Sequence, residues 1–271
     1  MRISIVQSSL HWENPSANRT MIAEKLLPLR GNTDLVVLPE MFTTGFSMNA
    51  TALAEPMNGP TMDWLRAVSQ DLNAAITGSF ICVERDQYFN RLIFIRPDGQ
   101  FDHYDKKHLF SLANEQENFS AGKKRLIVEW LGWRICPLIC YDLRFPAWSR
   151  NTQWEQRSSI SNVQGPNVQY DLLIYVANWP NRRAHHWRSL LVARAIENQS
   201  FVVGVNIAGA DGNDFEYSGD SAIIDHSGQP LAQIPDGKED IVTVNISLED
   251  LKAYRVQLPF LLDADVFEFK A

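Results

Sequence analysis

The sequence of 271 residues predicts a single layered α/β domain. Short apolar runs that are typical of buried strands alternate with segments of helical periodicity. The order is strand–helix, strand–helix, a run of strands, strand–helix, strand–helix and then final strands. Because no internal repeat or low-complexity linker interrupts this order, we expect one domain rather than two.

Strands are expected where apolar residues run together or alternate with polar ones. The turn residues 85–87, 97–99 and 131–132 separate several of these runs. The predicted strands, in chain order, are 3–8, 34–39, 75–84, 88–96, 100–105, 126–130, 133–139, 171–177 and 201–206, with a final set from Tyr217 onward.

Helices are expected where apolar residues recur every three or four positions. Thr61 is the expected N-cap of the second helix and Ser247 that of the last. The predicted helices are 15–29, 62–73, 184–199 and 248–255.

Composition and charge argue against several classes of function. The net charge of -7 disfavours a polyanionic partner such as a nucleic acid. No apolar run approaches the roughly 20 residues that a membrane span needs. The chain opens on a short strand-like run rather than a signal peptide. Three cysteines, an odd and sparse number, indicate a reduced, cytoplasmic protein.

The apolar run 135–139 ends abruptly at Cys140, and Pro146 suits the first turn of a following helix. Cys140 is therefore expected on a strand-to-helix turn, where a helix N-terminus would lower the pKa of its thiol. The alternative is a buried cysteine that acts only as a small hydrophobe. Cys136 would lie about 13 Å from Cys140 on one strand, too far for a disulfide. We expect no metal site, because no further ligand cluster accompanies these cysteines.

Two other predicted strands also end on charged residues. Glu40 follows the strand 34–39, and Lys106 follows the strand 100–105. Each could be a solvated surface charge. Ligands, however, gather at the carboxyl ends of strands in layered α/β folds. A cysteine, a glutamate and a lysine suffice for acyl transfer: Glu40 as the base, Lys106 with the Tyr141 N–H for the oxyanion, and Cys140 as the nucleophile.

Three sequence blocks, 39–42, 106–110 and 139–146, resemble the signature blocks of the nitrilase (carbon–nitrogen hydrolase) superfamily. Further similarity at 179–180, 194–199 and 217–221 extends the resemblance over nearly the whole chain. The pattern is most similar to the omega-amidase branch, which hydrolyses 2-oxoglutaramate.

The resemblance implies both a fold and a set of roles. The fold is a four-layer αββα sandwich that forms dimers through its helical layers, and the tail 256–271 is a candidate for packing on a partner subunit. The catalytic residues are Glu40, Lys106 and Cys140, with Glu115 as the second glutamate and Glu117 as the alternative for that last role. No metal or organic cofactor is expected.

The remote carboxylate of such a substrate calls for an arginine near the site. Arg183 is the candidate, although Arg182 and Arg183 could be a solvated loop pair, and Arg144 is expected to be structural. Phe42 and Trp179 are candidate pocket walls, with core packing as the alternative.

The sequence thus predicts a cysteine amidase that cleaves small omega-amides through a thioester and releases ammonia. An N-carbamoyl-amine hydrolase or nitrilase of the same superfamily is the first alternative. A catalytically silent dimeric binding protein is the second. The polar stretch 152–167 looks longer than in relatives, and a lid, a dimer contact and a passive insertion remain open for it.

Overall fold

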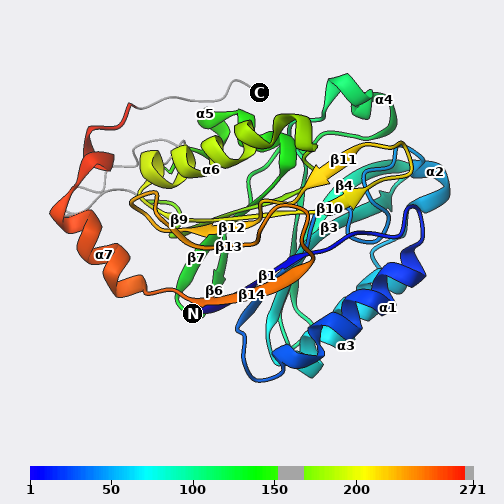
Figure 1. Cartoon of the computed structure of the whole chain (residues 1–271), viewed down its shortest axis with the longest axis horizontal. Helices are drawn as coiled ribbons and strands as arrows, with labels where there is room; N and C mark the ends of the chain where they lie inside the picture. Colours follow the sequence, from blue (N-terminus) through cyan, green and yellow to red (C-terminus); the bar gives the residue numbers. More distant parts are fainter. Residues whose placement is uncertain (152–167, 266–271) are drawn as a thin grey trace.

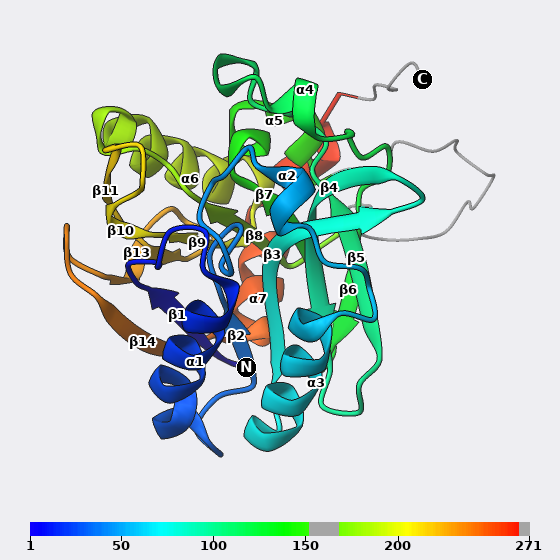
Figure 2. The ribbon, with the colours of Figure 1, turned by 90° about the vertical axis from the view of Figure 1, so that its right-hand side faces the viewer.

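The computed structural model describes residues 1–151 and 168–265. The stretch 152–167 and the final part of the tail, 266–271, lie outside the described residues. Two six-stranded sheets lie face to face with helices on their outer faces (Figures 1 and 2). This arrangement confirms the predicted αββα sandwich.

The first sheet has the strand order β14-β1-β2-β3-β4-β5. Its centre is parallel, because Leu35 pairs with Ile3 on one side and with Ala75 on the other. β14 adds an antiparallel edge beside β1. The strands are β1 (Arg2–Gln7), β2 (Leu35–Val37), β3 (Ala75–Glu84), β4 (Gln87–Ile95), β5 (Phe101–Asp105) and β14 (Asp240–Asn245).

The second sheet has the order β13-β12-β9-β8-β7-β6 and again a parallel centre, in which Leu172 pairs with Ile135 and Phe201. Its strands are β6 (Val128–Trp130), β7 (Trp133–Ile139), β8 (Leu172–Ala177), β9 (Phe201–Asn206), β12 (Ala222–Ile224) and β13 (Pro230–Gln233). A separate two-stranded ribbon consists of β10 (Ala208–Ala210) and β11 (Glu216–Ser218).

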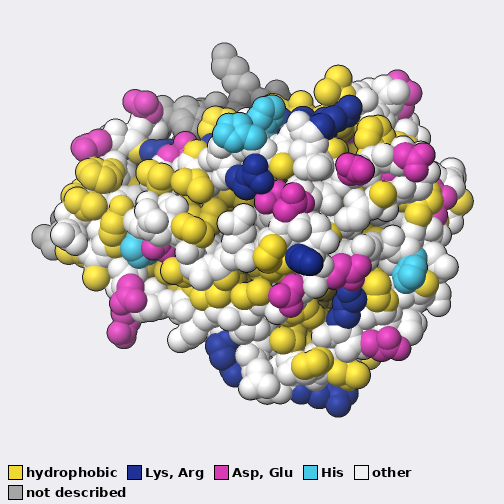
Figure 3. Space-filling view, viewed as in Figure 1, with side chains coloured by type: hydrophobic (Ala, Val, Ile, Leu, Met, Phe, Trp, Pro, Cys, Tyr) yellow, Lys and Arg dark blue, Asp and Glu magenta, His cyan; other side chains and the backbone are white. Residues whose placement is uncertain are grey.

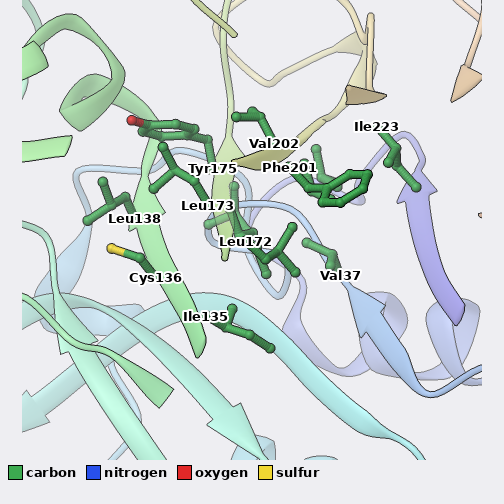
Figure 4. Close-up of a cluster of buried hydrophobic side chains, with 14 of the residues drawn as sticks. Val37, Ile135, Cys136, Leu138, Leu172, Leu173, Tyr175, Phe201, Val202 and Ile223 are labelled. Carbon is green, nitrogen blue, oxygen red and sulfur yellow. The ribbon is translucent and has the colours of Figure 1, made fainter. Parts of the chain in front are cut away.

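The main core lies between the sheets, and strand alternation builds it. In β2, Leu35 and Val37 belong to the core shared with the second sheet, whereas Val36 packs in the helix-side core. Val37 shares its cluster with Leu172 and Phe201 of the second sheet (Figure 4). Each fully buried side chain of this kind contributes about 1.5–3 kcal/mol, so this core holds the two sheets together.

Helices α1 and α3 cover the first sheet, and α6 covers the second (Figures 1 and 2). In the described part of the chain, no helix is long and apolar enough to cross a membrane. The α-helices are α1 (Pro15–Leu26), α2 (Ala50–Leu53), α3 (Pro60–Leu72), α4 (Glu115–Asn118), α5 (Pro146–Ser149), α6 (Ala184–Asn198) and α7 (Leu248–Gln257). Short 3-10 segments are η1 (Leu27–Leu29), η2 (Ser111–Ala113), η3 (Cys140–Arg144), η4 (Asn181–Arg183) and η5 (Phe260–Asp263).

Two local predictions were wrong. The second long helix begins at Pro60, with Gly59 at the N-cap position, because proline suits the first turn; Thr61 lies inside the helix. The β3–β4 turn has only two residues, Arg85 and Asp86, both at positive φ. By contrast, Ser247 does cap α7, since its hydroxyl accepts the Asp250 N–H at 3.2 Å.

Candidate active site

The site lies where strands of both sheets end. Glu40 follows β2 and Lys106 follows β5, both of the first sheet, whereas Cys140 follows β7 and Asn178 follows β8 of the second. β5 runs parallel to β2 because two antiparallel pairings, β3–β4 and β4–β5, separate β5 from β3. Their carboxyl ends therefore meet at the same edge of the molecule.

Lys106 lies at the centre of this group and contacts two glutamates. Its Nζ lies 2.8 Å from Glu40 Oε1 and 2.9 Å from Glu115 Oε2, and all three side chains are fully buried. Glu115 is the first residue of the short helix α4, and its Oε2 also accepts the Phe110 N–H at 2.5 Å. The alternative residue, Glu117, lies exposed on the same helix.

Burial and charge act in opposite directions on this group. Burial alone would lower the pKa of Lys106, but the carboxylates of Glu115 and Glu40 outweigh it and raise that pKa. Lys106 is therefore a permanent cation. Burial raises the pKa of Glu115, with Lys106 opposing the change and the Glu40 charge adding to it.

Two asparagines complete the group, and the sequence interpretation missed both. Asn90 Nδ2 donates to Glu40 Oε1 at 2.8 Å and faces Glu115 Oε1 at 3.4 Å, while Ser79 Oγ donates to Asn90 Oδ1. The Asn178 N–H donates to the other Glu40 oxygen at 2.8 Å. A buried asparagine inside the apolar strand β4 was the available signal, because such a group needs hydrogen-bond partners.

Cys140 begins η3 directly after β7, at a positive φ of 42° that is uncommon for a residue other than glycine. The strand-to-turn position is thus as predicted. The expected fall in thiol pKa is wrong: burial and then the Glu40 charge raise the pKa of Cys140 well above its usual range, and Lys106 opposes them only in part. Glu40 thus lies close enough to the thiol to change its pKa.

Tyr141 follows Cys140 in the first turn of η3, where backbone N–H groups have no partner within the helix. Both residues line a cavity of about 460 Å³. The charge of Lys106 also acts on the Cys140 thiol, so this cation lies near the sulfur. Among residues 1–151 and 168–265, no group of histidine, cysteine and carboxylate side chains could hold a metal ion.

Of the two aromatic residues predicted as pocket walls, the structure brings one to the cavity. Trp179 lines it, and its Nε1 donates to the Arg183 carbonyl at 2.9 Å. Phe42 is fully buried in the helix-side core against Trp64, so the prediction for it is corrected. Phe46, four residues later, lines the cavity instead, and the centroid of its ring lies 5.1 Å from Lys106 Nζ.

Three arginines, Arg144, Arg182 and Arg183, line the same cavity. Arg183 is half-buried over the Phe110 ring, and burial together with the charges of Arg182 and Arg144 lowers its pKa. Arg144, expected to be structural, lies over the Trp179 ring at 4.7 Å and faces the cavity. This part of the wall therefore has a positive charge suited to an anionic group.

Comparisons with known proteins found similar sequences and structures over nearly the whole chain. The carbon-nitrogen hydrolase model matches residues 2–256. An omega-amidase YafV of Yersinia enterocolitica is 44% identical over 267 residues, covering 98% of each chain. A 2-oxoglutaramate amidase of Bacillus subtilis is 34% identical over 265 residues, covering 96% of each.

The crystal structure of XC1258 from Xanthomonas campestris, a CN-hydrolase superfamily protein with an arsenic adduct in its active site, is also similar. It matches with a TM-score of 0.94 and 47% identity over 100% of this chain and 99% of that one. The fold and site define a hydrolase of carbon–nitrogen bonds other than peptide bonds. The chain belongs to the carbon–nitrogen hydrolase family of the nitrilase superfamily.

Proposed function

We propose that the chain is a cysteine-dependent omega-amidase that hydrolyses the terminal amide of a small dicarboxylic acid monoamide such as 2-oxoglutaramate. The observation that carries this proposal is the buried ammonium of Lys106, held between Glu40 and Glu115 beside the Cys140 thiol. This arrangement provides a nucleophile, a base and a fixed cation at one point.

In the proposed acylation, the Cys140 sulfur attacks the amide carbonyl while its proton passes to Glu40. Because the thiol pKa is raised, attack depends on this transfer rather than on a preformed thiolate. Lys106 and the Tyr141 N–H stabilise the oxyanion. Glu40 then returns the proton to the nitrogen as the carbon–nitrogen bond breaks, and ammonia leaves a thioester on Cys140.

In the proposed deacylation, Glu40 takes a proton from a water molecule whose oxygen attacks the thioester. The carbon–sulfur bond breaks, the free acid leaves, and the thiol regains its proton from Glu40. Glu115 holds Lys106 in place through both steps, with its two oxygens 3.0 and 2.9 Å from Nζ.

For substrate choice, we assign Arg183 to the remote carboxylate. It is half-buried, it lines the cavity that contains Cys140, and no carboxylate lies in salt-bridge contact with it in the described part of the chain. Trp179 forms the adjoining wall. The omega-amidase and 2-oxoglutaramate amidase names of the relatives support the same substrate class.

The test is ammonia release from 2-oxoglutaramate, succinamate, an N-carbamoyl amine and a nitrile, with Cys140→Ala as the control. We expect turnover of the omega-amides by the wild-type protein alone. Carbon dioxide release from the carbamoyl compound, or preferred turnover of the nitrile, would favour the other enzymes of the superfamily. Equal ammonia release by the Cys140→Ala variant would refute the assignment of the nucleophile.

We further propose that the protein is a cytoplasmic homodimer or larger homo-oligomer. Hydrophobic side chains gather over α7 and the residues after it (Figure 3), where Val256, Phe260 and Leu262 are exposed. All three cysteines are free thiols, which suits a reducing compartment. Light scattering after size-exclusion chromatography tests the assembly, and a monomeric mass would contradict it.

A further inference from the structure

We propose that Asp142, His108 and Tyr104 form a positioning unit, here called the Asp142 clamp, that fixes the distance between Lys106 and Cys140. This inference rests on the proposed function of those two residues. The clamp does not touch the reacting atoms; it acts by holding the two segments that carry them.

The carboxylate of Asp142 is fully buried and receives donors from three places. Its Oδ2 accepts the Tyr104 hydroxyl at 2.7 Å and the Ile139 N–H at 3.1 Å. Its Oδ1 lies 2.7 Å from His108 Nδ1 and accepts the His108 N–H at 3.1 Å. A buried carboxylate with four such contacts is held rigidly, because losing any of them would leave a polar group unpaired.

These contacts join residues that lie close in sequence to Lys106 and Cys140. Asp142 lies two residues after Cys140, and His108 lies two residues after Lys106, with Tyr104 two residues before it. β5 is the edge strand of the first sheet and β7 belongs to the second, so the carboxylate links the two sheets next to the site.

Aromatic side chains enclose the clamp. The His108 ring stacks on Phe145 with a centroid distance of 3.8 Å, and Trp148 Nε1 donates to the Tyr104 hydroxyl at 3.0 Å. The Lys107 N–H approaches the same hydroxyl at 3.2 Å. The loop after β5 and the turn after β7 are therefore joined by packing as well as by hydrogen bonds.

The test uses Asp142→Asn, which keeps the shape of the side chain but places an amide NH₂ against groups that donate. We expect kcat for the omega-amide to fall at least tenfold and KM to change less than twofold. We also expect the apparent pKa of Cys140, measured from the pH dependence of iodoacetamide alkylation, to rise as Lys106 moves away. A role limited to overall stability would leave that pH profile unchanged.

The matched control is Asp102→Asn, also on β5, whose carboxylate pairs with Arg96 at the surface and which should keep wild-type kcat. A folded Asp142→Asn variant with kcat within twofold of wild type overturns the proposal. Should that variant fail to fold, Tyr104→Phe decides: a severalfold loss of kcat at unchanged KM supports the clamp, and unchanged kcat overturns it.

A parallel Cys140→Ala variant separates this proposal from the one on which it rests. If Cys140→Ala still releases ammonia, the catalytic assignment itself fails. If Cys140→Ala is inactive while Asp142→Asn is fully active, only the clamp fails.

Discussion

Lys106 has an ammonium group with no exposure to solvent, placed between two carboxylates that are equally buried. Such an arrangement is weak evidence for a stabilising role, because desolvating three charges offsets most of their attraction. Removing one of the three charged groups is nevertheless strongly destabilising, because it leaves uncompensated charge in the interior. The same residue is therefore expected to matter for both the fold and the chemistry.

Lys106→Ala should abolish detectable ammonia release and lower the free energy of unfolding by about 3–5 kcal/mol, because Glu40 and Glu115 lose their shared cation. Urea unfolding and ammonia assays measure the two effects. Lys107→Ala is the matched control, since Lys107 is part-exposed and its Nζ lies over the Trp148 ring at 5.5 Å. A larger loss of activity from Lys107→Ala would reverse the assignment.

Cys140 should show an unusual pH dependence. Burial and the Glu40 charge raise its pKa, so the thiol is neutral at pH 7 and the thiolate fraction grows only as pH rises. Glu40→Gln removes the negative charge, which should move the midpoint of iodoacetamide alkylation to lower pH while amide hydrolysis is lost. Glu117→Gln, exposed on α4, is the control. A midpoint that stays or moves upward in Glu40→Gln would contradict the electrostatic account.

Arg183→Ala should raise KM for 2-oxoglutaramate about ten- to a hundredfold, because a hydrogen bond to a charged group is worth about 1.5–3 kcal/mol. KM for a neutral amide of similar size should not change. Steady-state kinetics on both substrates makes the comparison, with Arg30→Ala as the control, because Arg30 is a surface arginine that pairs with Asp71 and does not line the cavity. An equal rise in KM for both substrates would show that Arg183 shapes the cavity rather than binding the carboxylate.

At the scale of elements, the end of β5 depends on a close backbone approach. The Gly122 N–H donates to the Lys106 carbonyl at 2.8 Å, and a Cβ on Gly122 would lie 1.9 Å from the Asp105 carbonyl oxygen. Only glycine allows this contact without moving the backbone. The position of Lys106 is thus tied to a residue outside the signature blocks.

Gly122→Ala should therefore lower the free energy of unfolding by an amount near the upper end of the range of about 1–3 kcal/mol that overpacking costs. It should also reduce kcat, because the added Cβ displaces Lys106. Gly99→Ala is the comparison variant, because Gly99 has a positive φ of 84° but open space around it. Gly99→Ala should lower the free energy of unfolding by only about 1–2 kcal/mol, the strain of a left-handed conformation, and should leave kcat unchanged. Unchanged kcat in a folded Gly122→Ala variant would contradict the coupling to Lys106.

At the scale of the whole molecule, the site exists only because two sheets meet. Glu40 and Lys106 come from the first sheet, and Cys140 and Asn178 from the second. The Glu40–Lys106 contact joins residues 66 positions apart, and the Glu40–Asn178 contact joins residues 138 apart. The core between the sheets therefore brings these polar groups within reach of one another.

Sequence reasoning succeeded where one strand decides the outcome. An apolar run that ends on Glu40 or Cys140, or a short strand between turns that ends on Lys106, identifies a polar group at a strand end, whatever the partner strands are. Prediction from the sequence failed where the packing of separate segments determines which side chains meet. Asn90 meets Glu40 only through the order of the sheet strands, and the thiol pKa of Cys140 depends on burial that a turn prediction does not include.

The choice between Phe42 and Phe46 shows the same limit. Both are aromatic residues after β2, and composition does not separate them. The backbone has a positive φ just before each of them, 44° at Met41 and 74° at Gly45, and Phe42 packs in the core while Phe46 lines the cavity. Such a turn is set by contacts that the local sequence does not specify.

In the proposed mechanism, Cys140 carries the acyl group. The most direct measurement is the intact mass of protein quenched rapidly in acid during turnover of 2-oxoglutaramate, followed by peptide mapping. We expect the mass to increase by that of the acyl group, with the added mass on the peptide that contains Cys140 and removed by hydroxylamine. An acyl group on another residue, or continued turnover after complete alkylation of Cys140, would contradict it.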